Sequence, residues 1–232
     1  MTPLMKHALA IFAKTPVAGK VKTRLTPPLS PEQSAELYRC MLLDTVARMS
    51  ALQFDTFLFY DGEPEFFHAA SPHLQLIRQT DASLGRRLED AFTVLADLGY
   101  QARVVIGSDA PDLPLAFVRQ AFDQLLDGRD AVFGPAEDGG YYLVGIRGEY
   151  GALFRDIPWS GPQVLVKSLA TAERDGLDCA LLPAWYDVDS AEDLQRPGLC
   201  DPFNGAPLTR DFLRNLGIAT SETTVASCSP CS

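Results

Sequence analysis

The hydrophobic positions of this chain form short apolar runs that alternate with longer stretches of helical periodicity. Short apolar runs bounded by turn residues are typical of strands buried in a parallel sheet, and apolar residues three and four apart are typical of amphipathic helices. The runs expected to be strands are 7–13, 54–60, 74–78, 103–106, 130–135, 141–146 and 177–182. The stretches expected to be helices are 31–49, 63–70, 83–98, 113–126, 162–174 and 208–216.

This alternation of strand and helix predicts an α/β fold with a mostly parallel central sheet and helices on both faces. A chain of 232 residues suits one large domain or two small ones, and no internal repeat or Gly/Ser linker divides it. We therefore expect residues 6–218 to form one domain. The small and polar residues 219–232 are expected to be a disordered tail.

The composition narrows the classes of partner. The net charge of −10 argues against a general nucleic-acid binder, although a local basic loop can still bind phosphate. No apolar run is long enough to cross a bilayer, and the N-terminus lacks the apolar region of a signal peptide. We expect a cytoplasmic protein without a membrane or nucleic-acid partner; its oligomeric state is left open.

The cysteine pattern adds little. Of the five cysteines, Cys40 and Cys179 lie in apolar surroundings and are expected to be buried, unreactive thiols. Cys228 and Cys231 form a single C-x-x-C pair near the C-terminus, and one such pair is weak support for a zinc site. We interpret it as part of the tail.

A basic loop follows the first expected strand. Within the eleven residues 14–24 it carries four cations: Lys14, Lys20, Lys22 and Arg24. It has neither the spacing of a P-loop nor a G-x-G-x-x-G fingerprint. One interpretation is a solvated basic loop. The other is a cradle for phosphates, in which Arg24 forks onto phosphate oxygens and Lys22 acts as a point charge.

Carboxylates follow two extended segments. The run 103–106 ends in Gly-Ser-Asp109, and ligands of open parallel sheets bind beyond the carboxyl ends of the strands, so we favour a functional role for Asp109. Asp112 is expected to cap the next helix. Asp187 and Asp189 lie on one side of an extended segment, and a helix cap at Asp189 or Ser190 explains only one of them. Two such carboxylates indicate a cation between them.

Two further motifs are ambiguous. Gly85, Arg86 and Arg87 begin the helix that Ser83 can cap, where arginines either bind an anion or face water. The turn 138–140, Asp-Gly-Gly, is either a simple hairpin or a place where backbone approaches a ligand.

Histidine and cysteine chemistry is absent from these motifs. The three histidines lie at positions 7, 68 and 73, outside every candidate motif, and no Ser-His or Cys-His arrangement suggests covalent catalysis. Cations and carboxylates of this kind stabilise charge on phosphate groups.

Four motifs in order resemble a known family. They are KTPVAGKVKTRL at 14–25, GSDAPDL at 107–113, GPAEDGGYY at 134–142 and DVDSAEDL at 187–194. Together they resemble the selenodomain-associated transferases, a branch of the nucleotide-diphospho-sugar transferase superfamily with the GT-A (Rossmann-like) fold, over roughly Lys6 to Arg196. The phospholactate or phosphoenolpyruvate guanylyltransferases of deazaflavin cofactor synthesis are similar at residues 22–25 and at the acidic positions.

The resemblance implies roles for individual residues. The implied ligands of Mg²⁺ or Mn²⁺ are Asp109, Asp187 and Asp189. The implied phosphate-binding loop contributes Lys14, Gly19, Lys22, Thr23 and Arg24. The segment Leu84-Gly85-Arg86-Arg87 would lie near the nucleotide, and Asp138, Gly139 and Gly140 near the acceptor or ribose. The implied catalytic residues are Lys22, Arg24 and Asp109. The first loop has fewer glycines and more cations than that of better-known sugar nucleotidyltransferases, whose substrate rules therefore do not transfer.

Three functions are compatible with these residues. The leading hypothesis is metal-dependent nucleotidyl transfer from a nucleoside triphosphate to a small phosphate- or carboxylate-bearing acceptor, with release of pyrophosphate. The second is a glycosyltransferase with a nucleotide-sugar donor and Asp138 as base. The third is a nucleotide-binding module without turnover. A phosphatase of the Asp-x-Asp type is rejected, because its motif would follow the first strand. The base and the acceptor stay open.

Overall fold

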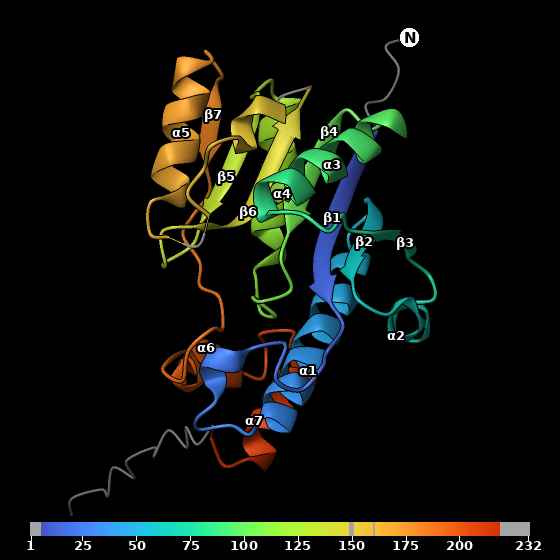
Figure 1. Ribbon diagram of the computed structural model, residues 1–232, viewed down its shortest axis with the longest axis vertical. Helices are drawn as coiled ribbons and strands as arrows, with labels where there is room; N and C mark the ends of the chain where they lie inside the picture. The colour runs from blue at the N-terminus through green and yellow to red at the C-terminus, as the bar shows by residue number, and fades with distance from the viewer. Residues whose placement is uncertain (1–5, 149–150, 160, 219–232) are drawn as a thin grey trace, which may run out of the picture.

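All seven expected strands pair into one sheet in the computed structural model of the chain, which describes residues 6–148, 151–159 and 161–218 (Figure 1). The strands are β1 (His7–Lys14), β2 (Asp55–Asp61), β3 (Gln75–Arg78), β4 (Ala102–Ile106), β5 (Ala131–Pro135), β6 (Tyr141–Arg147) and β7 (Cys179–Leu181). The expected tail 219–232, with its C-x-x-C pair, lies outside the described residues.

The strand order is β3-β2-β1-β4-β6-β5-β7. All neighbours are parallel except β6, which is antiparallel to both β4 and β5. Residues 136–140 alone join β5 to β6, and so short a connection can only make a hairpin. From β1 the chain moves outward through β2 and β3 and then returns to β4 on the other side of β1. The direction in which successive strands are added to the sheet therefore reverses between β1 and β4. Open α/β sheets form their ligand crevice at such a position.

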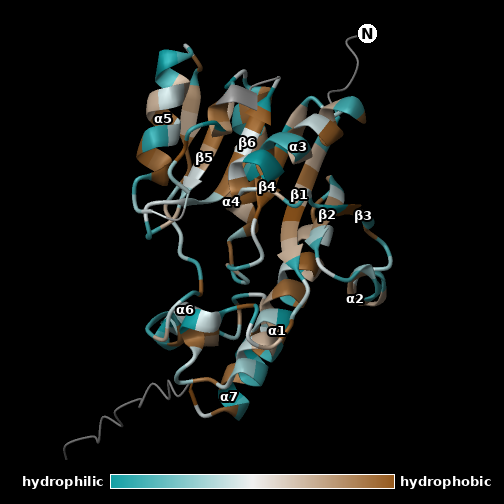
Figure 2. Ribbon diagram, viewed as in Figure 1, coloured by the Kyte–Doolittle hydropathy of each residue, from teal (hydrophilic) through white to brown (hydrophobic). Residues whose placement is uncertain are grey.

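Helices cover both faces of the sheet, as the sequence predicts. Alternate residues of β1 supply the two faces: Leu9 and Ile11 pack in the core with α1 (Pro31–Ser50), α2 (Pro64–Ala70) and α4 (Leu115–Leu126). Ala8 and Ala10 pack in the opposite core with α3 (Leu84–Asp97) and α5 (Val164–Arg174). Figure 2 shows the apolar strands between helices that carry polar residues outside. No helix among the described residues is long and apolar enough to cross a membrane.

The C-terminal segment returns to the first part of the chain. Three short elements, η3 (Asp193–Gln195), α6 (Pro197–Cys200) and α7 (Pro207–Asn215), lie near α1 (Figure 1). They share a buried cluster with α1 and with η1 (Thr23–Leu25), a short helix where the sequence predicts a loop. The α1 residue Asp44 accepts hydrogen bonds from the backbone N–H groups of Leu208 (3.2 Å) and Thr209 (2.7 Å) at the start of α7. This packing holds residues 187–194 against the basic loop.

The expectation that Asp112 caps the following helix is wrong. The helix α4 begins at Leu115, with Pro114 at its N-cap position. It does not begin at Leu113, because the residue before a proline is disfavoured in helical conformation. Asp112 is instead buried, and it accepts hydrogen bonds from Trp185 Nε1 (3.3 Å) and from the Tyr186 hydroxyl. Burial raises the pKa of its carboxyl above the ordinary value.

The expected cap at Asp189 or Ser190 is also wrong. The Asp193 carboxylate accepts hydrogen bonds from the backbone N–H groups of Asp189 (3.1 Å) and Ser190 (2.8 Å), and it thereby closes the turn before η3. Neither side chain of the predicted pair is needed to start a helix. Helix capping therefore explains neither carboxylate of the 187–189 segment.

Candidate active site

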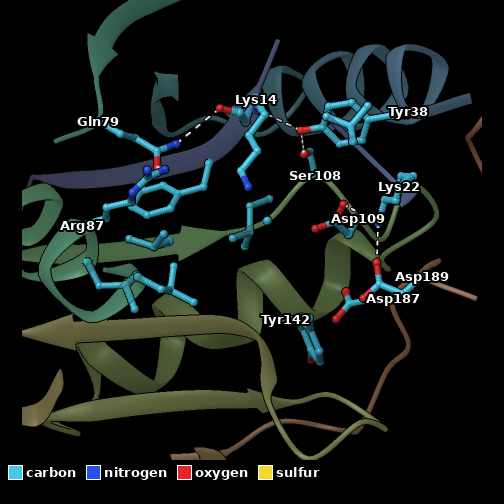
Figure 3. Close-up of a pocket in the computed structure, with 18 of the residues that line it drawn as sticks. Lys14, Lys22, Tyr38, Gln79, Arg87, Ser108, Asp109, Tyr142, Asp187 and Asp189 are labelled. Atoms are coloured by element: carbon cyan, nitrogen blue, oxygen red, sulfur yellow. Dashed lines mark hydrogen bonds and ion pairs between the residues drawn. The ribbon is translucent and has the colours of Figure 1, made fainter. Parts of the chain in front are cut away.

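A cavity of about 660 Å³ opens at the carboxyl ends of β1 and β4 (Figure 3). Its walls come from the basic loop after β1, the turn after β4, the first residues of β6, the first turn of α3 and the 187–189 segment. This is the position where the strand order reverses. Cavities of several hundred cubic ångströms at such positions accommodate small-molecule ligands.

Tyr38 of α1 fixes the ends of both central strands. Its hydroxyl accepts a hydrogen bond from the Lys14 backbone N–H (2.9 Å) and bonds to Ser108 Oγ (2.8 Å). Burial, followed by the nearby charge of Asp109, raises the pKa of Tyr38 to about 12. Tyr38 is therefore a neutral brace between the loop after β1 and the turn after β4.

A backbone hydrogen bond brings the three aspartates together. The Val188 N–H donates to the Asp109 carbonyl oxygen (2.9 Å), and the Val188 side chain is fully buried. Because side chains alternate along an extended segment, burial of Val188 turns Asp187 and Asp189 away from that core. All three carboxylates line the cavity.

Lys22 lies between two of these carboxylates. Its Nζ is 2.6 Å from Asp109 Oδ1 and 2.6 Å from Asp189 Oδ1, and its side chain is 4% exposed. The carboxylate side chains are 41% and 42% exposed. Burial alone would lower the pKa of Lys22, but the two carboxylates outweigh burial and hold this pKa above its ordinary value. The predicted phosphate contact is thus engaged with carboxylates in this structure.

Asp187 has a different environment from the other two aspartates. Burial, and next the negative charge of Asp109, raise the pKa of Asp187 to about 7, while the charge of Lys22 opposes this shift. A cation placed near Asp187 would favour its charged form.

The donor chemistry of this set suits a hard divalent cation, since Mg²⁺ and Mn²⁺ prefer carboxylate oxygens. In the described part of the chain, however, no three His, Cys, Asp or Glu side chains are arranged as a ready metal group. The ammonium of Lys22 takes the space between Asp109 and Asp189. A metal placed between Asp109 Oδ1 and Asp189 Oδ1 would therefore have to displace the Lys22 ammonium.

The remaining cations of the basic loop are free to bind an anion. Lys14, Lys20 and Arg24 line the cavity and are exposed, and none of them forms an ion pair with another described residue. Thr23 also lines the cavity. Unpaired cations that face one cavity suit the oxygens of a phosphate chain.

Fixed polar groups lie at the other end of the cavity from the aspartates (Figure 3). Arg87 Nη1 donates to Asp61 Oδ2 (2.8 Å) and to Gln79 Oε1 (3.1 Å). Gln79 Nε2 in turn donates to the Phe59 carbonyl oxygen (2.7 Å). These hydrogen bonds hold the orientation of Gln79 and Arg87 before any ligand binds.

Arg86, which the sequence also predicts near the ligand, lies outside the cavity lining. Arg86 pairs with Glu89 (3.1 Å) and Asp90 (3.1 Å) on its own helix and does not line the cavity. Helical spacing separates the two arginines, because Arg87 is three residues after Leu84, which lines the cavity. Periodicity within α3 is therefore the sequence signal that distinguishes Arg87 from Arg86.

Several predicted binding residues lie outside the cavity lining. They are Gly19, Gly85, Arg86, Asp138, Gly139 and Gly140. Gly85 has a packing reason, since a Cβ there would lie 2.6 Å from both Phe154 O and Trp159 Nε1. The ligand roles of this group stay predictions. The cavity lining also includes Arg87, for which the sequence leaves anion binding open, and four residues to which the sequence assigns no role: Tyr38, Gln79, Ser108 and Tyr142.

Gly139 is required by a close backbone contact. Its φ is +90°, and a Cβ there would lie 2.1 Å from the Pro162 carbonyl oxygen. Gly99 is a matched control, because its φ is +89° and a Cβ there would meet nothing within 4 Å. We expect Gly99→Ala to cost about 1–2 kcal/mol of unfolding free energy. Gly139→Ala should cost about 1–3 kcal/mol more, measured by urea unfolding. Equal losses in both variants would contradict this role of the contact.

The sequence matches a family over its middle part. The profile of the family described as "Uncharacterized protein conserved in bacteria (DUF2064)" matches residues 42–161, just over half of the chain. The chain belongs to the DUF2064 family. The matched range includes Asp109 but neither the basic loop nor the 187–189 segment.

One solved structure is similar to this chain over most of its length. A protein of Desulfovibrio desulfuricans G20, provisionally assigned to the nucleotide-diphospho-sugar transferases, is 32% identical to this DUF2064 chain with a TM-score of 0.83. The alignment covers 91% of this chain and 98% of that one.

More distant structures share the fold. A cytidylyltransferase of Leptospira borgpetersenii is 13% identical, with a TM-score of 0.58 and coverage of 94% of this chain and 98% of that one. The CMP:2-keto-3-deoxy-manno-octonic acid synthetase, complexed with CTP, is 14% identical, with a TM-score of 0.54 and coverage of 82% and 95%. A comparison with curated proteins gives no significant match. The expected fold and the expected enzyme class, a transferase, are supported by these similarities.

Proposed function

We propose that this protein transfers a nucleotidyl group from a nucleoside triphosphate to a small phosphate- or carboxylate-bearing acceptor and releases pyrophosphate. The observation that carries the proposal is one cavity lined both by cations of the basic loop that form no ion pair with a described residue and by three aspartates. Such a cavity binds a polyphosphate and can neutralise the charge that develops during phosphoryl chemistry. The likeness to cytidylyltransferases supports the fold that this reaction uses.

The chain's own residues supply charge and position. An acceptor oxygen would attack the α-phosphorus, and the bond from that phosphorus to the oxygen bridging to the β-phosphate would break. Arg24 and Lys14 would bind the polyphosphate oxygens and stabilise the leaving pyrophosphate. Asp109, Asp187 and Asp189 would hold Mg²⁺ or Mn²⁺, which would neutralise charge on the phosphates. An anionic acceptor needs no general base, in keeping with the absence of histidine from the cavity lining.

The second candidate is glycosyl transfer from a nucleotide-diphospho-sugar. The observation in its favour is the 32% identical Desulfovibrio protein, whose name refers to this class of donor. Asp138, the residue proposed as base, lies on the turn before β6 and does not line the cavity. This position makes nucleotidyl transfer the better supported of the two. A binding module without turnover is the third candidate.

The finer resemblances belong to the same proposal. We infer that the selenodomain-associated transferases and the phospholactate or phosphoenolpyruvate guanylyltransferases are relatives that use an equivalent set of residues. The support is the joint presence of the basic loop and the three aspartates in one cavity.

Ligand binding followed by product analysis tests the proposal. A thermal-shift panel of nucleoside triphosphates and nucleotide sugars, each with and without Mg²⁺, should give one preferred class, since a ligand at a hundred times its Kd stabilises by about 2.7 kcal/mol. The protein is then incubated with the preferred nucleotide and with a protein-free extract of small metabolites, which supplies the acceptor. Pyrophosphate as product supports nucleotidyl transfer, and free nucleoside diphosphate supports glycosyl transfer. Binding without consumption supports the binding module, and no binding of any nucleotide overturns all three.

A further inference from the structure

The ammonium of Lys22 lies where a metal bound by both Asp109 and Asp189 would have to lie. It is 2.6 Å from an oxygen of each carboxylate, and the segment that carries Asp189 also carries Asp187. Three carboxylates and one ammonium leave this end of the cavity with a net negative charge. A divalent cation is attracted by that charge but excluded by the lysine.

The contacts of Lys22 differ from those of an ordinary surface ion pair. Its side chain is 4% exposed, whereas the two carboxylates are 41% and 42% exposed to the cavity. The carboxylates are thus partly open to the cavity, whereas the lysine side chain that contacts both of them is shielded from solvent. Its backbone is in the left-handed region (φ 48°, ψ 40°) immediately before η1, an uncommon conformation for a residue other than glycine.

To admit a metal between the two carboxylates, the Lys22 ammonium has to change partners. A lysine ammonium is carried on a flexible four-carbon stem, so it can change partners by rotation of its side chain alone. Lys14, Lys20 and Arg24 line the same cavity. A polyphosphate bound by these three cations would bring anionic oxygens into the cavity that Lys22 also lines.

We propose that Lys22 and a divalent metal compete for the space between Asp109 and Asp189, and that a polyphosphate relieves this competition by giving Lys22 another anion. Metal and polyphosphate then bind with positive cooperativity, and the free protein holds metal weakly. This inference rests on the proposed function, because it assumes that the cavity binds a polyphosphate.

The competition has a reciprocal consequence. A metal that enters alone must displace an ammonium that has no other anion to contact. With polyphosphate present, the displaced ammonium gains phosphate oxygens, so each ligand should raise the affinity for the other by the same factor. Coupling between two sites is commonly about 5- to 150-fold in affinity.

Metal binding without any nucleotide tests the competition directly. The probe is Mn²⁺ alone, with free Mn²⁺ measured by electron paramagnetic resonance, on the wild type and on Lys22→Met. We expect Lys22→Met to bind Mn²⁺ at least about tenfold more tightly than the wild type, since methionine keeps the length of the side chain without its charge. Equal or weaker binding by a folded Lys22→Met overturns the proposal.

A matched variant controls for the loss of charge. Lys20 belongs to the same loop and lines the same cavity, but it forms no ion pair with a described residue. Lys20→Met should therefore bind Mn²⁺ within about threefold of the wild type. If Lys20→Met tightens Mn²⁺ binding as much as Lys22→Met does, a general charge effect explains the result and the proposal is overturned.

A second measurement needs no variant. Wild-type protein is titrated with Mn²⁺ in the presence and in the absence of inorganic pyrophosphate. A metal buffer sets the free Mn²⁺ concentration at each point, because pyrophosphate itself binds Mn²⁺. We expect pyrophosphate to raise Mn²⁺ affinity at least about fivefold, and this gain to be smaller in Lys22→Met. Tight Mn²⁺ binding by the wild type that pyrophosphate does not change overturns the proposal, even if Lys22→Met fails to fold.

The two proposals fail separately. If nucleotides are consumed but Lys22 has no influence on Mn²⁺ binding, the proposed function stands and the competition is refuted. If Lys22→Met binds Mn²⁺ more tightly and pyrophosphate couples to Mn²⁺, but no nucleotide is consumed, the competition stands and the transferase reaction is refuted.

Discussion

Asp109→Ala should lower nucleotide turnover by about a thousandfold or more and leave the protein folded. Asp109 faces the cavity at the end of β4, where it contacts the Lys22 ammonium at 2.6 Å. Removal of one group that stabilises charge in a reaction typically costs about a hundred- to a thousandfold in rate. Here the same change also removes a proposed metal ligand, so the upper end of that range is expected. The measurement is the initial rate of pyrophosphate or nucleoside diphosphate release.

The fold should survive because the structural contact of Asp109 is made by its backbone. Its carbonyl oxygen accepts the hydrogen bond from the Val188 N–H (2.9 Å), and alanine retains that carbonyl. Lys22 also keeps Asp189 as a partner. Asp123 is a matched control, since it is exposed on α4 and its side chain forms no ion pair with a described residue. Asp123→Ala should keep full activity. A folded Asp109→Ala that retains a tenth of the wild-type rate would refute the role of this carboxylate.

Local patterns predict the strands and helices well, because each depends on residues close in sequence. The seven apolar runs are all strands of one sheet, and Ser30 caps α1 through reciprocal hydrogen bonds with Gln33, only three residues away. The predicted helix cap at Asp112 is wrong because the contacts of this residue are distant in sequence. Its partners Trp185 and Tyr186 are 73 and 74 residues further along the chain, and capping was the only local explanation for a carboxylate in that position.

The site residues also divide into those whose position follows from neighbouring residues and those whose contacts depend on distant parts of the chain. Asp109 and the basic loop were predictable because they follow the carboxyl ends of β4 and β1, and parallel strands bring such ends together. That Lys22 lies between Asp109 and Asp189 was not predictable, since 167 residues separate Lys22 from Asp189. The sequence contains the charges, but only the tertiary fold decides which of them contact one another.

Arg24→Ala should reduce kcat/KM for the nucleotide by about a hundred- to a thousandfold. Arg24 is exposed at the cavity within η1 and forms no ion pair with a described residue, so its guanidinium is available to the phosphate that we propose it binds. Its planar fork can bind two phosphate oxygens at once, which a point charge cannot. Because negative charge grows on the leaving pyrophosphate, much of the loss should be in kcat rather than in KM.

Two further variants isolate this effect. Arg24→Lys keeps the charge without the fork and should recover only part of the lost rate. Arg119→Ala removes an exposed arginine from α4, outside the cavity lining, and should behave as the wild type. Arg24 is exposed and forms no ion pair with a described residue, so thermal unfolding of Arg24→Ala should be unchanged. A loss of activity in Arg24→Ala no greater than that in Arg119→Ala would mean that the basic loop does not bind the reacting phosphates.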